Sequence, residues 1–251
     1  QTYYQLSFSC YLSDHYPIAI KYCEEAVDIY RAANNRRMLG QSLSLLCEIQ
    51  NYVGNNKLAS DYCFNALEIF DELNAERLKP ALYNTIGSIN YDIKNYDIAR
   101  ENFLLAIELS KKLDLEYPLS DAYLSIGEVL RDTEEYESAL DYFKQSLKID
   151  RANEDDEGVS YAFLNIGTTF ILQGEYERAL QLLEGALEIA EDYGDILMQG
   201  KASLEMGKAY YNLNNNDEAF SFLNRSLRHA KRIGNGKLLK ECYLNLANYY
   251  Y

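Results

Sequence analysis

The stretch "YLSIGEVLRDTEEYESALDYFKQSLKID", residues 123–150, decides the fold. Its apolar residues recur at helical spacing: Tyr123, Ile126 and Leu130 form one stripe, and apolar residues within 139–147 form a second. The intervening "RDTEEY" is short and polar, as expected of a turn between two antiparallel helices. One such pair has too few apolar residues to close a core alone, so we expect it to stack on further copies.

A forty-residue internal repeat runs along the whole chain. Steps of forty residues from Gly127 reach only small residues, which we call the anchors: Ser7, Cys47, Gly87, Gly127, Gly167, Gly207 and Ala247. Twelve residues after the first six anchors lie Ala19, Ala59, Ala99, Ala139, Ala179 and Ala219. Nineteen residues after them lie Ala26, Ala66, Ala106, Ser146, Ala186 and Ser226. Small residues at these points allow helix axes to approach closely, which predicts stacked helix pairs.

The order of large and small residues resembles the tetratricopeptide repeat. In "YNTIGSIN…NYDIARENFLLAIEL" the matching residues are Tyr83, Ile86, Gly87, Tyr96, Ala99, Phe103 and Ala106. In "FLNIGTTF…EYERALQLLEGALEI" they are Phe163, Ile166, Gly167, Phe170, Tyr176, Ala179, Leu183 and Ala186. The resemblance covers the whole chain. It implies an all-α, right-handed superhelical solenoid of antiparallel helix pairs, with six repeats plus the first helix of a seventh.

The chain departs from the family pattern in two ways. The usual unit has about 34 residues, and the proline that commonly closes its second helix is absent here, so longer helices are implied. In this respect the chain is similar to the forty-residue variant of peptide-sensing bacterial regulators and of animal polarity adaptors. Ser7 and Cys47 also replace the anchor glycine in the first two repeats. Because both ends fall within first helices, we expect residues 1–251 to be a single solenoid domain excised from a longer chain.

Composition excludes some partners. The net charge is −15 and no Lys/Arg cluster could neutralise several phosphates, so we expect no nucleic-acid partner. No run of about eighteen apolar residues occurs, so we expect no membrane span within this segment. The acidic "EDDE", residues 154–157, is interpreted as a solvated loop, with a docking site for a basic partner as the alternative.

The five cysteines are interpreted as core thiols. Cys10, Cys23, Cys47 and Cys63 occupy repeat positions that elsewhere hold core residues, and the chain has no CxxC motif. We therefore expect a reducing compartment and a cytoplasmic location. A disulfide between Cys47 and Cys63, which lie within one repeat, is an alternative that we do not favour.

The sequence carries no catalytic pattern. Its two histidines, His15 and His229, lie in opposite terminal repeats, and no Ser/His/Asp or Cys/His set can be assembled locally. No glycine-rich phosphate loop and no metal-ligand spacing occurs. We therefore predict that the chain is not an enzyme and uses no cofactor or metal.

The resemblance implies that the first helices line a concave groove in which a protein or peptide segment binds. Groove candidates are residues at non-core positions of the first helices: Ser44, Glu48, Asn84, Ser88, Tyr91, Glu128, Arg131, Asn165, Thr168, Lys208, Tyr211, Asn212, Asn245 and Asn248. Tyr52 and Tyr251 are further aromatic candidates. Because Lys201, Lys208 and Arg131 are interspersed with acidic residues, recognition of a partner's terminal carboxylate is disfavoured.

Two candidates raise a specific alternative. Asn165 and Asn245 occupy the same repeat position, and an amide can both donate to and accept from an extended peptide backbone. This predicts an asparagine ladder for the partner. The alternative is that these amides merely bond neighbouring helices.

The C-terminal "YLNLANYYY", residues 243–251, belongs to a first helix whose second helix is missing. Its open apolar surface predicts end-to-end self-association. For the function, two hypotheses share one binding chemistry. The first is a sensory or regulatory module of a larger bacterial signalling protein, and the second is a stand-alone adaptor that assembles protein complexes in trans.

Overall fold

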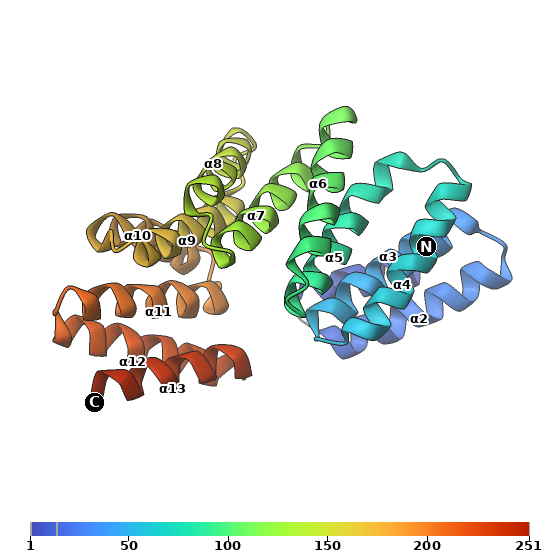
Figure 1. The fold of residues 1–251 in the computed structure, drawn as a ribbon. Helices are drawn as coiled ribbons and strands as arrows, with labels where there is room; N and C mark the ends of the chain where they lie inside the picture. The colour runs from blue at the N-terminus through green and yellow to red at the C-terminus, as the bar shows by residue number, and fades with distance from the viewer. Residues whose placement is uncertain (1, 14, 251) are drawn as a thin grey trace. The chain divides into compact units, whose positions relative to one another are not determined.

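The computed structural model describes residues 2–13 and 15–250. Within these ranges the chain forms thirteen α-helices and one 3₁₀-helix, η1, and contains no β-strand (Figure 1). The elements are α1 Thr2–Leu12, α2 Tyr16–Ala32, α3 Arg36–Tyr52, α4 Asn56–Glu72, η1 Glu76–Leu78, α5 Lys79–Asp92, α6 Tyr96–Lys112, α7 Glu116–Asp132, α8 Tyr136–Ala152, α9 Asp156–Leu172, α10 Tyr176–Asp192, α11 Ile196–Asn212, α12 Asn216–Ile233 and α13 Gly236–Tyr250. The predicted six helix pairs plus one first helix are confirmed.

From Asn34 to Gly234 the turns recur every twenty residues and are of one kind. Each has one residue with a positive φ: Asn34, Gly54, Asn74, Lys94, Asp114, Glu134, Glu154, Gly174, Gly194, Asn214 and Gly234. The next residue donates its backbone N–H to a carbonyl five residues earlier, as from Asn55 to Gln50 at 2.8 Å and from Glu135 to Leu130 at 2.7 Å. This is the Schellman bond that ends a helix after a left-handed residue. The helices therefore reverse direction at a regular interval.

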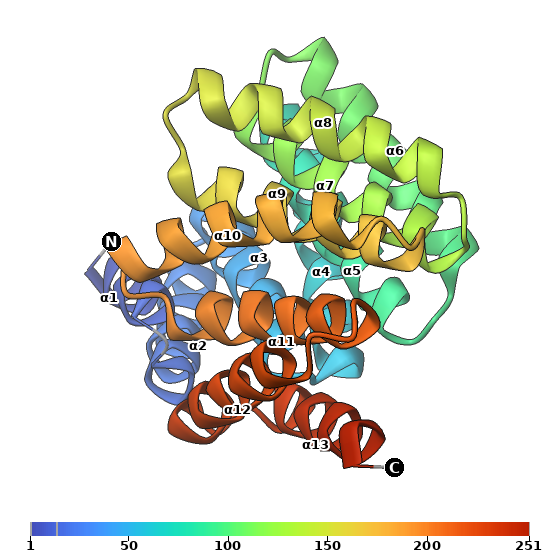
Figure 2. The same cartoon turned by 90° about the vertical axis from the view of Figure 1, so that its left-hand side faces the viewer.

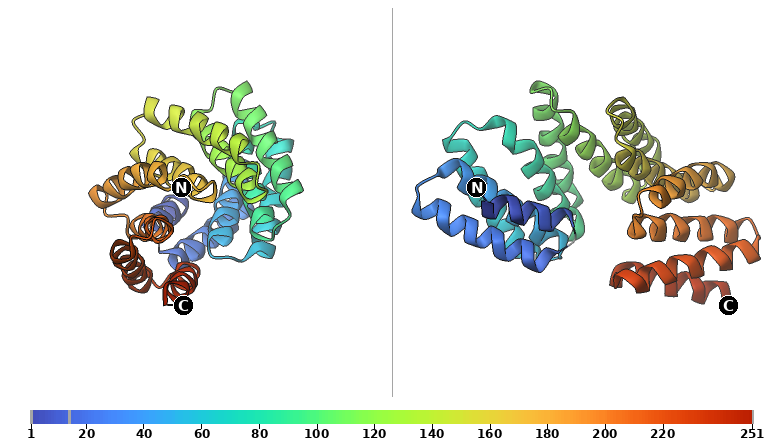
Figure 3. Two further views of the ribbon diagram at one scale, coloured as in Figure 1. Left: turned by 60° about the vertical axis from the view of Figure 1, so that its left-hand side comes forward. Right: turned by 180° about the vertical axis from the view of Figure 1, so that it is seen from behind.

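The chain divides into two compact units, residues 1–129 (unit 1) and 130–251 (unit 2). In unit 1, each helix from α1 to α6 packs against the next, and α3 also contacts α1 and α5. In unit 2, each helix from α8 to α13 packs against the next, and α11 also contacts α9 and α13 (Figures 2 and 3). Within each unit the first helices therefore form one layer, and the second helices form another.

The core lies where the repeat has its small residues. All six alanines that follow an anchor by twelve residues are fully buried, from Ala19 in α2 to Ala219 in α12. The small residues seven positions later, such as Ala66 and Ser226, are buried as well. Small side chains at these points allow close packing of the helices, as the sequence predicted.

The anchor residue and the residue sixteen positions later share one space. A Cβ atom on Gly87 would lie 2.5 Å from Phe103 Cε1, and one on Gly207 would lie 2.8 Å from Leu223 Cγ. Where the anchor is larger, the facing residue is smaller. Ser7 is opposite Cys23, a cysteine where Phe103 and Leu223 stand in other repeats. The Ser7 hydroxyl donates to the Ala19 carbonyl at 2.8 Å, and the Cys23 thiol donates to the Ser42 carbonyl at 3.1 Å. In the first two repeats the anchor is larger than glycine, and the residue that faces it is a cysteine instead of a phenylalanine or leucine.

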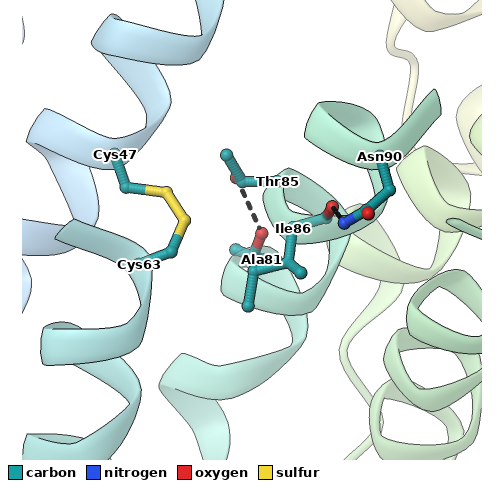
Figure 4. Close-up of a disulfide and its surroundings, with 6 residues drawn as sticks. All are labelled: Cys47, Cys63, Ala81, Thr85, Ile86 and Asn90. Atoms are coloured by element: carbon teal, nitrogen blue, oxygen red, sulfur yellow. Dashed lines mark hydrogen bonds between the residues drawn. A yellow bond between two sulfur atoms is a disulfide. The ribbon is translucent and has the colours of Figure 1, made fainter. Parts of the chain in front are cut away.

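Cys47 and Cys63 are joined by a disulfide, which corrects the expectation that all five cysteines are core thiols (Figure 4). The pair occupies the anchor and its facing position, which the α3–α4 hairpin brings to a Cα–Cα distance of 5.2 Å. That separation suits a disulfide. Cys10, Cys23 and Cys242 are free. Since disulfides persist in oxidising compartments, the bond weakens the argument that placed the chain in a reducing one.

The start of α5 breaks the regular pattern. Residues of η1 occupy the place of a first helical turn, and α5 begins at Lys79, directly before Pro80. The Lys79 ammonium is nearly buried and lies 2.5 Å from Asp71 Oδ1 and 2.6 Å from Glu76 Oε1. Two carboxylates thus compensate the burial of this charge.

The last first helix, α13, differs from its predecessors because no described helix follows it. Its anchor, Ala247, is exposed, whereas Gly167 and Gly207 are buried. Tyr243 and Leu244 are 53% and 55% exposed. Tyr251, one of the predicted aromatic contacts, lies outside the described residues. No helix in the described part of the chain is long and apolar enough to cross a membrane.

Candidate functional site

Two positions on each first helix carry accessible side chains, one and five residues after the anchor. They lie one turn apart on the same side of the helix. We call them the first-helix face. In unit 1 it comprises Phe8, Leu12, Glu48, Tyr52, Ser88, Asp92 and Glu128, and in unit 2 Asp132, Thr168, Leu172, Lys208, Asn212 and Asn248. All of these side chains are exposed or half-buried.

Three rings meet beside this face in unit 1. The ring centroids of Tyr16 and Tyr52 are 4.9 Å apart, and Tyr11 lies 6.2 Å from Tyr16 and 6.5 Å from Tyr52. The Tyr11 ring stands nearly perpendicular to that of Tyr52, at 84°. We call Tyr11, Tyr16 and Tyr52 the tyrosine cluster. It is assembled from α1, α2 and α3, and Tyr52 remains 55% exposed.

Glu48 stands one helical turn before Tyr52, and hydrogen bonding between the Tyr11 hydroxyl and its carboxylate contributes to the pKa of both groups. The side chain is exposed, yet surrounding protein atoms desolvate the carboxylate and raise its pKa above the usual range, while the hydrogen bond from Tyr11 opposes the rise. Burial, reinforced by the negative charges of Glu48 and Asp121, raises the pKa of Tyr11. Among the described residues Glu48 forms no ion pair, so none of their cations neutralises its charge.

The other predicted residues of unit 1 lie in different surroundings. Asn84 is only 9% exposed and donates through Nδ2 to the Pro118 carbonyl, 3.2 Å away, so it joins α5 to α7. Tyr91 is half-buried with its ring 5.9 Å from that of Tyr96. Ser44, Ser88 and Glu128 are half-buried.

In unit 2, Arg131 and Asn165 are brought together. Arg131 Nη1 donates to Asn165 Oδ1 at 2.6 Å, and Asn165 Nδ2 donates to the Tyr161 carbonyl at 3.1 Å. The Arg131 guanidinium also lies 6.0 Å from the centre of the Phe143 ring. Asn165 is only 5% exposed, and its bond with Arg131 joins two helices, as the helix-to-helix alternative describes, whereas its bond to Tyr161 lies within α9.

The remaining predicted residues of unit 2 lie nearer its C-terminal end. Lys208 Nζ pairs with Glu205 Oε1 at 2.6 Å, and Thr168 donates its hydroxyl to the Leu164 carbonyl at 2.8 Å. Half-buried Asn245 donates to the Glu241 carbonyl of its own helix at 2.9 Å. Asn165 and Asn245 therefore donate to their own helices in the same way, four residues back, and Asn165 in addition accepts a hydrogen bond from Arg131.

A pocket of about 520 Å³ opens where α11, α12 and α13 meet. It is lined by Tyr211, Asn212, Asn214, Asn216 and Tyr249. The Tyr211 hydroxyl donates to the Asn248 carbonyl at 3.3 Å, and the rings of Tyr211 and Tyr249 are 6.4 Å apart. The pocket gathers amides and hydroxyls and is therefore suited to neutral polar groups.

Sequence reasoning missed Tyr11, Tyr16, Asn214 and Asn216. Tyr11 and Tyr16 are four and nine residues after their anchor, as are the contacting Tyr91 and Tyr96. That recurrence was the signal that could have found them. For the described residues, no group of three or more His, Cys, Asp or Glu side chains is placed to hold a metal ion.

The family model described as "Tetratricopeptide repeat" matches residues 78–152 and 118–192, and a second model of the same description matches residues 170–232. The model of anaphase-promoting complex subunit 5 matches residues 4–52. A comparison with curated proteins found no similar sequence.

Among solved structures, the chain is similar to a Rap protein complexed with Competence and Sporulation Factor, with a TM-score of 0.76, 16% identity, and coverage of 99% of this chain and 74% of that one. The apo quorum sensor NprR from B. thuringiensis gives a TM-score of 0.74 and 16% identity, with 99% and 69% covered. A signal transduction ATPase with a tetratricopeptide repeat sensor, from Pyrococcus horikoshii, gives 0.71 and 18%, with 98% and 38% covered. With matches that together span residues 78–232 and the helix pairs described above, the chain belongs to the tetratricopeptide repeat family.

Proposed function

We propose that this chain is a scaffold that binds a protein or peptide segment along its first-helix face. The observation that carries the proposal is a contrast between two sets of repeat positions. The packing positions hold small residues in every repeat, from Ala19 to Ala219. The accessible positions of the first-helix face differ chemically from repeat to repeat, with Glu48, Thr168 and Lys208 at one equivalent position.

This contrast is what a recognition surface on a solenoid requires. Constant packing positions keep each helix pair stacked on the next, and the accessible positions are then free to differ. Each repeat thereby presents its own combination of charge, amide and ring to a partner. Specificity comes from such combinations, because wrong partners meet unpaired charges and amides.

We further propose that the scaffold is the sensory or regulatory module of a larger bacterial signalling protein. The Rap complex with its factor, the quorum sensor NprR and the sensor of the signal transduction ATPase support this role by similarity of fold. The alternative is an adaptor that assembles complexes in trans through the same face. The reading frame on both sides of the segment separates them, because an adjoining catalytic or DNA-binding domain would support the sensor and a stop after a polar capping helix would support the adaptor.

The binding role is tested by peptide selection. A phage-displayed library of random peptides is panned against the whole chain, and fluorescence polarisation measures the affinity of each enriched peptide. Two double variants alter the face: Glu48→Ala with Tyr52→Ala in unit 1, and Lys208→Ala with Asn212→Ala in unit 2. The matched control, Glu184→Ala with Glu188→Ala, removes two exposed side chains spaced one turn apart on second helix α10.

We expect at least one face variant to weaken the selected peptides tenfold or more, while the control stays within about twofold. Circular dichroism confirms that each variant remains helical. The proposal fails if no peptide is enriched, or if the enriched peptides bind both face variants and the control alike.

Self-association through α13 is a separate proposal. It is supported by the exposed Tyr243 and Leu244 on a helix that packs on α12 and α11. We expect light scattering to show a mass that rises with concentration, and Leu244→Glu to reduce that rise. A monodisperse monomer at high concentration would count against it.

A further inference from the structure

Glu48 and the tyrosine cluster form a site whose charge lacks a counterpart. The Glu48 side chain is exposed and forms no ion pair with any described residue. The neighbouring α1, which supplies Tyr11, has no acidic residue in its first turn and no basic residue in its last. Among the described residues, no cation is therefore paired with the Glu48 carboxylate.

The rings around the carboxylate add a second feature. Tyr52 and Glu48 lie one turn apart on α3, so a group held by the carboxylate reaches the exposed surface of the Tyr52 ring. Tyr16 supports that ring at a centroid distance of 4.9 Å and an angle of 36°. Tyr11 stands across it at 84°.

We propose that Glu48 and the tyrosine cluster bind the guanidinium group of an arginine side chain carried by the partner. The guanidinium stacks on Tyr52 and donates hydrogen bonds to the free lone pairs of the Glu48 carboxylate. The inference rests on the proposed function and names the chemistry of its ligand: a basic, arginine-containing segment.

Arginine fits this arrangement better than lysine. Its guanidinium is planar, donates in a fork that matches a carboxylate, and stacks on aromatic faces. A lysine ammonium is a compact charge with a strongly held hydration shell, and it gains less from a flat ring. The net charge of −15 also favours approach of a basic segment to this chain.

The test uses small probes on the whole chain. Nα-acetyl-arginine amide is titrated against protein with ¹³C-labelled tyrosine rings, and the shifts of the assigned Tyr52 and Tyr11 resonances give its affinity. Nα-acetyl-citrulline amide is the neutral control of nearly the same shape, and Nα-acetyl-lysine amide is the control of equal charge. We expect both controls to bind at least tenfold more weakly than the arginine probe.

Variants connect the binding to the named residues. Glu48→Gln keeps the shape and an acceptor for the Tyr11 hydroxyl but removes the charge, and we expect at least a tenfold loss of affinity. Tyr52→Leu keeps an apolar side chain but removes the ring, and we expect a smaller loss. The matched controls, Glu68→Gln and Tyr117→Leu, alter an exposed carboxylate and an exposed tyrosine elsewhere in unit 1 and should leave the affinity unchanged.

Three results would overturn the proposal: equal binding of arginine and citrulline, equal binding of arginine and lysine, or unchanged binding by Glu48→Gln. These outcomes are independent of the peptide selection. Selected peptides that depend on the first-helix face but not on Glu48 leave the binding function standing and remove the arginine site. If the arginine probe binds at Glu48 but the chain enriches no peptide, the arginine site stands and the proposed peptide-binding function fails.

Discussion

The same helical frame carries different chemistry in the two units. At equivalent positions, α3 of unit 1 presents Glu48 and Tyr52, whereas α11 of unit 2 presents Lys208 and Asn212. The charge of Lys208 is matched within its own helix by Glu205, whereas Glu48 is paired with no described cation. The two helices therefore differ in what they present to a partner: α3 presents a carboxylate without a paired cation, and α11 presents a paired lysine and the neutral amide of Asn212.

The frame itself also differs between the units. The glycine anchors of unit 2, Gly167 and Gly207, each lie against a leucine, whereas the anchors of unit 1 include Ser7 and Cys47, each facing a cysteine. The comparison teaches that the frame constrains the summed volume of a facing pair rather than the identity of either residue. The following predictions test this difference, from the largest expected effect to the smallest.

The disulfide distinguishes unit 1 most strongly. A bridge across sixteen residues contributes about 3 kcal/mol through the unfolded state. We expect Cys47→Ala with Cys63→Ala to lower the free energy of unfolding of unit 1 by about that amount. Hydrogen exchange should then become faster in α3 and α4 but not in α10. Titration of the denatured, unreduced wild type should find three thiols, and five would contradict the pairing.

The glycine anchors should tolerate no side chain. Gly87→Ala places a Cβ atom 2.5 Å from the Phe103 ring, and we expect a loss of about 2 kcal/mol, measured by urea unfolding. Gly167→Ala places its Cβ 2.9 Å from Leu183 Cγ and should cost less. Ser88→Ala, on the face beside Gly87, is the control. Equal stability of Gly87→Ala and the control would show that Phe103 and its surroundings rearrange to accommodate the added methyl group.

Substitution by glycine at the positive-φ residue of a turn should stabilise both units. Lys94 in unit 1 and Glu134 in unit 2 have φ values of 62° and 65°, where a side chain is strained. We expect Lys94→Gly and Glu134→Gly each to raise the free energy of unfolding by about 1 kcal/mol. Gly174→Ala, at φ 79°, should change it in the opposite direction by a similar amount. A loss of stability in both glycine variants would contradict this account of the turns.

The smallest effect concerns the charge of Glu48. Because its pKa is raised in the folded state, the folded chain binds this proton more tightly than the unfolded chain. The associated stability is present below the usual glutamate pKa and is lost as pH rises through the raised value. Glu48→Gln should therefore melt higher than the wild type at neutral pH, with the difference shrinking toward acid pH. A lower melting temperature at neutral pH would mean that the ionised bond to Tyr11 outweighs desolvation.

This last prediction also sharpens the binding proposal. A residue that served only to stabilise unit 1 would lose stability when it is neutralised. If the Glu48 carboxylate instead binds a partner's arginine, the Glu48→Gln variant should be more stable than the wild type and should bind arginine more weakly. The two measurements on Glu48→Gln therefore separate the structural role from the binding role.

Much of the fold followed from the repeat. The anchors and the alanines twelve residues later marked every helix pair, because close helix packing admits only small side chains there. The turn positions were harder to find, since Lys94, Glu134 and Glu154 adopt a conformation that their residue types rarely favour. The candidate site followed only in part: Glu48 and Tyr52 were found from their first-helix positions, but Tyr11 and Tyr16 were not.

The sequence by itself determined the helix pairs, their period and the small residues of the core, because these depend on local periodicity and on size. The tertiary structure alone decided how particular side chains are used. It buried Asn84 and Asn165 in bonds between helices, joined Cys47 to Cys63, and gathered three tyrosines beside Glu48. Residues far apart in sequence come into contact only through the stacking of helices. The sequence pattern gives their positions along each helix but does not show which side chains they contact.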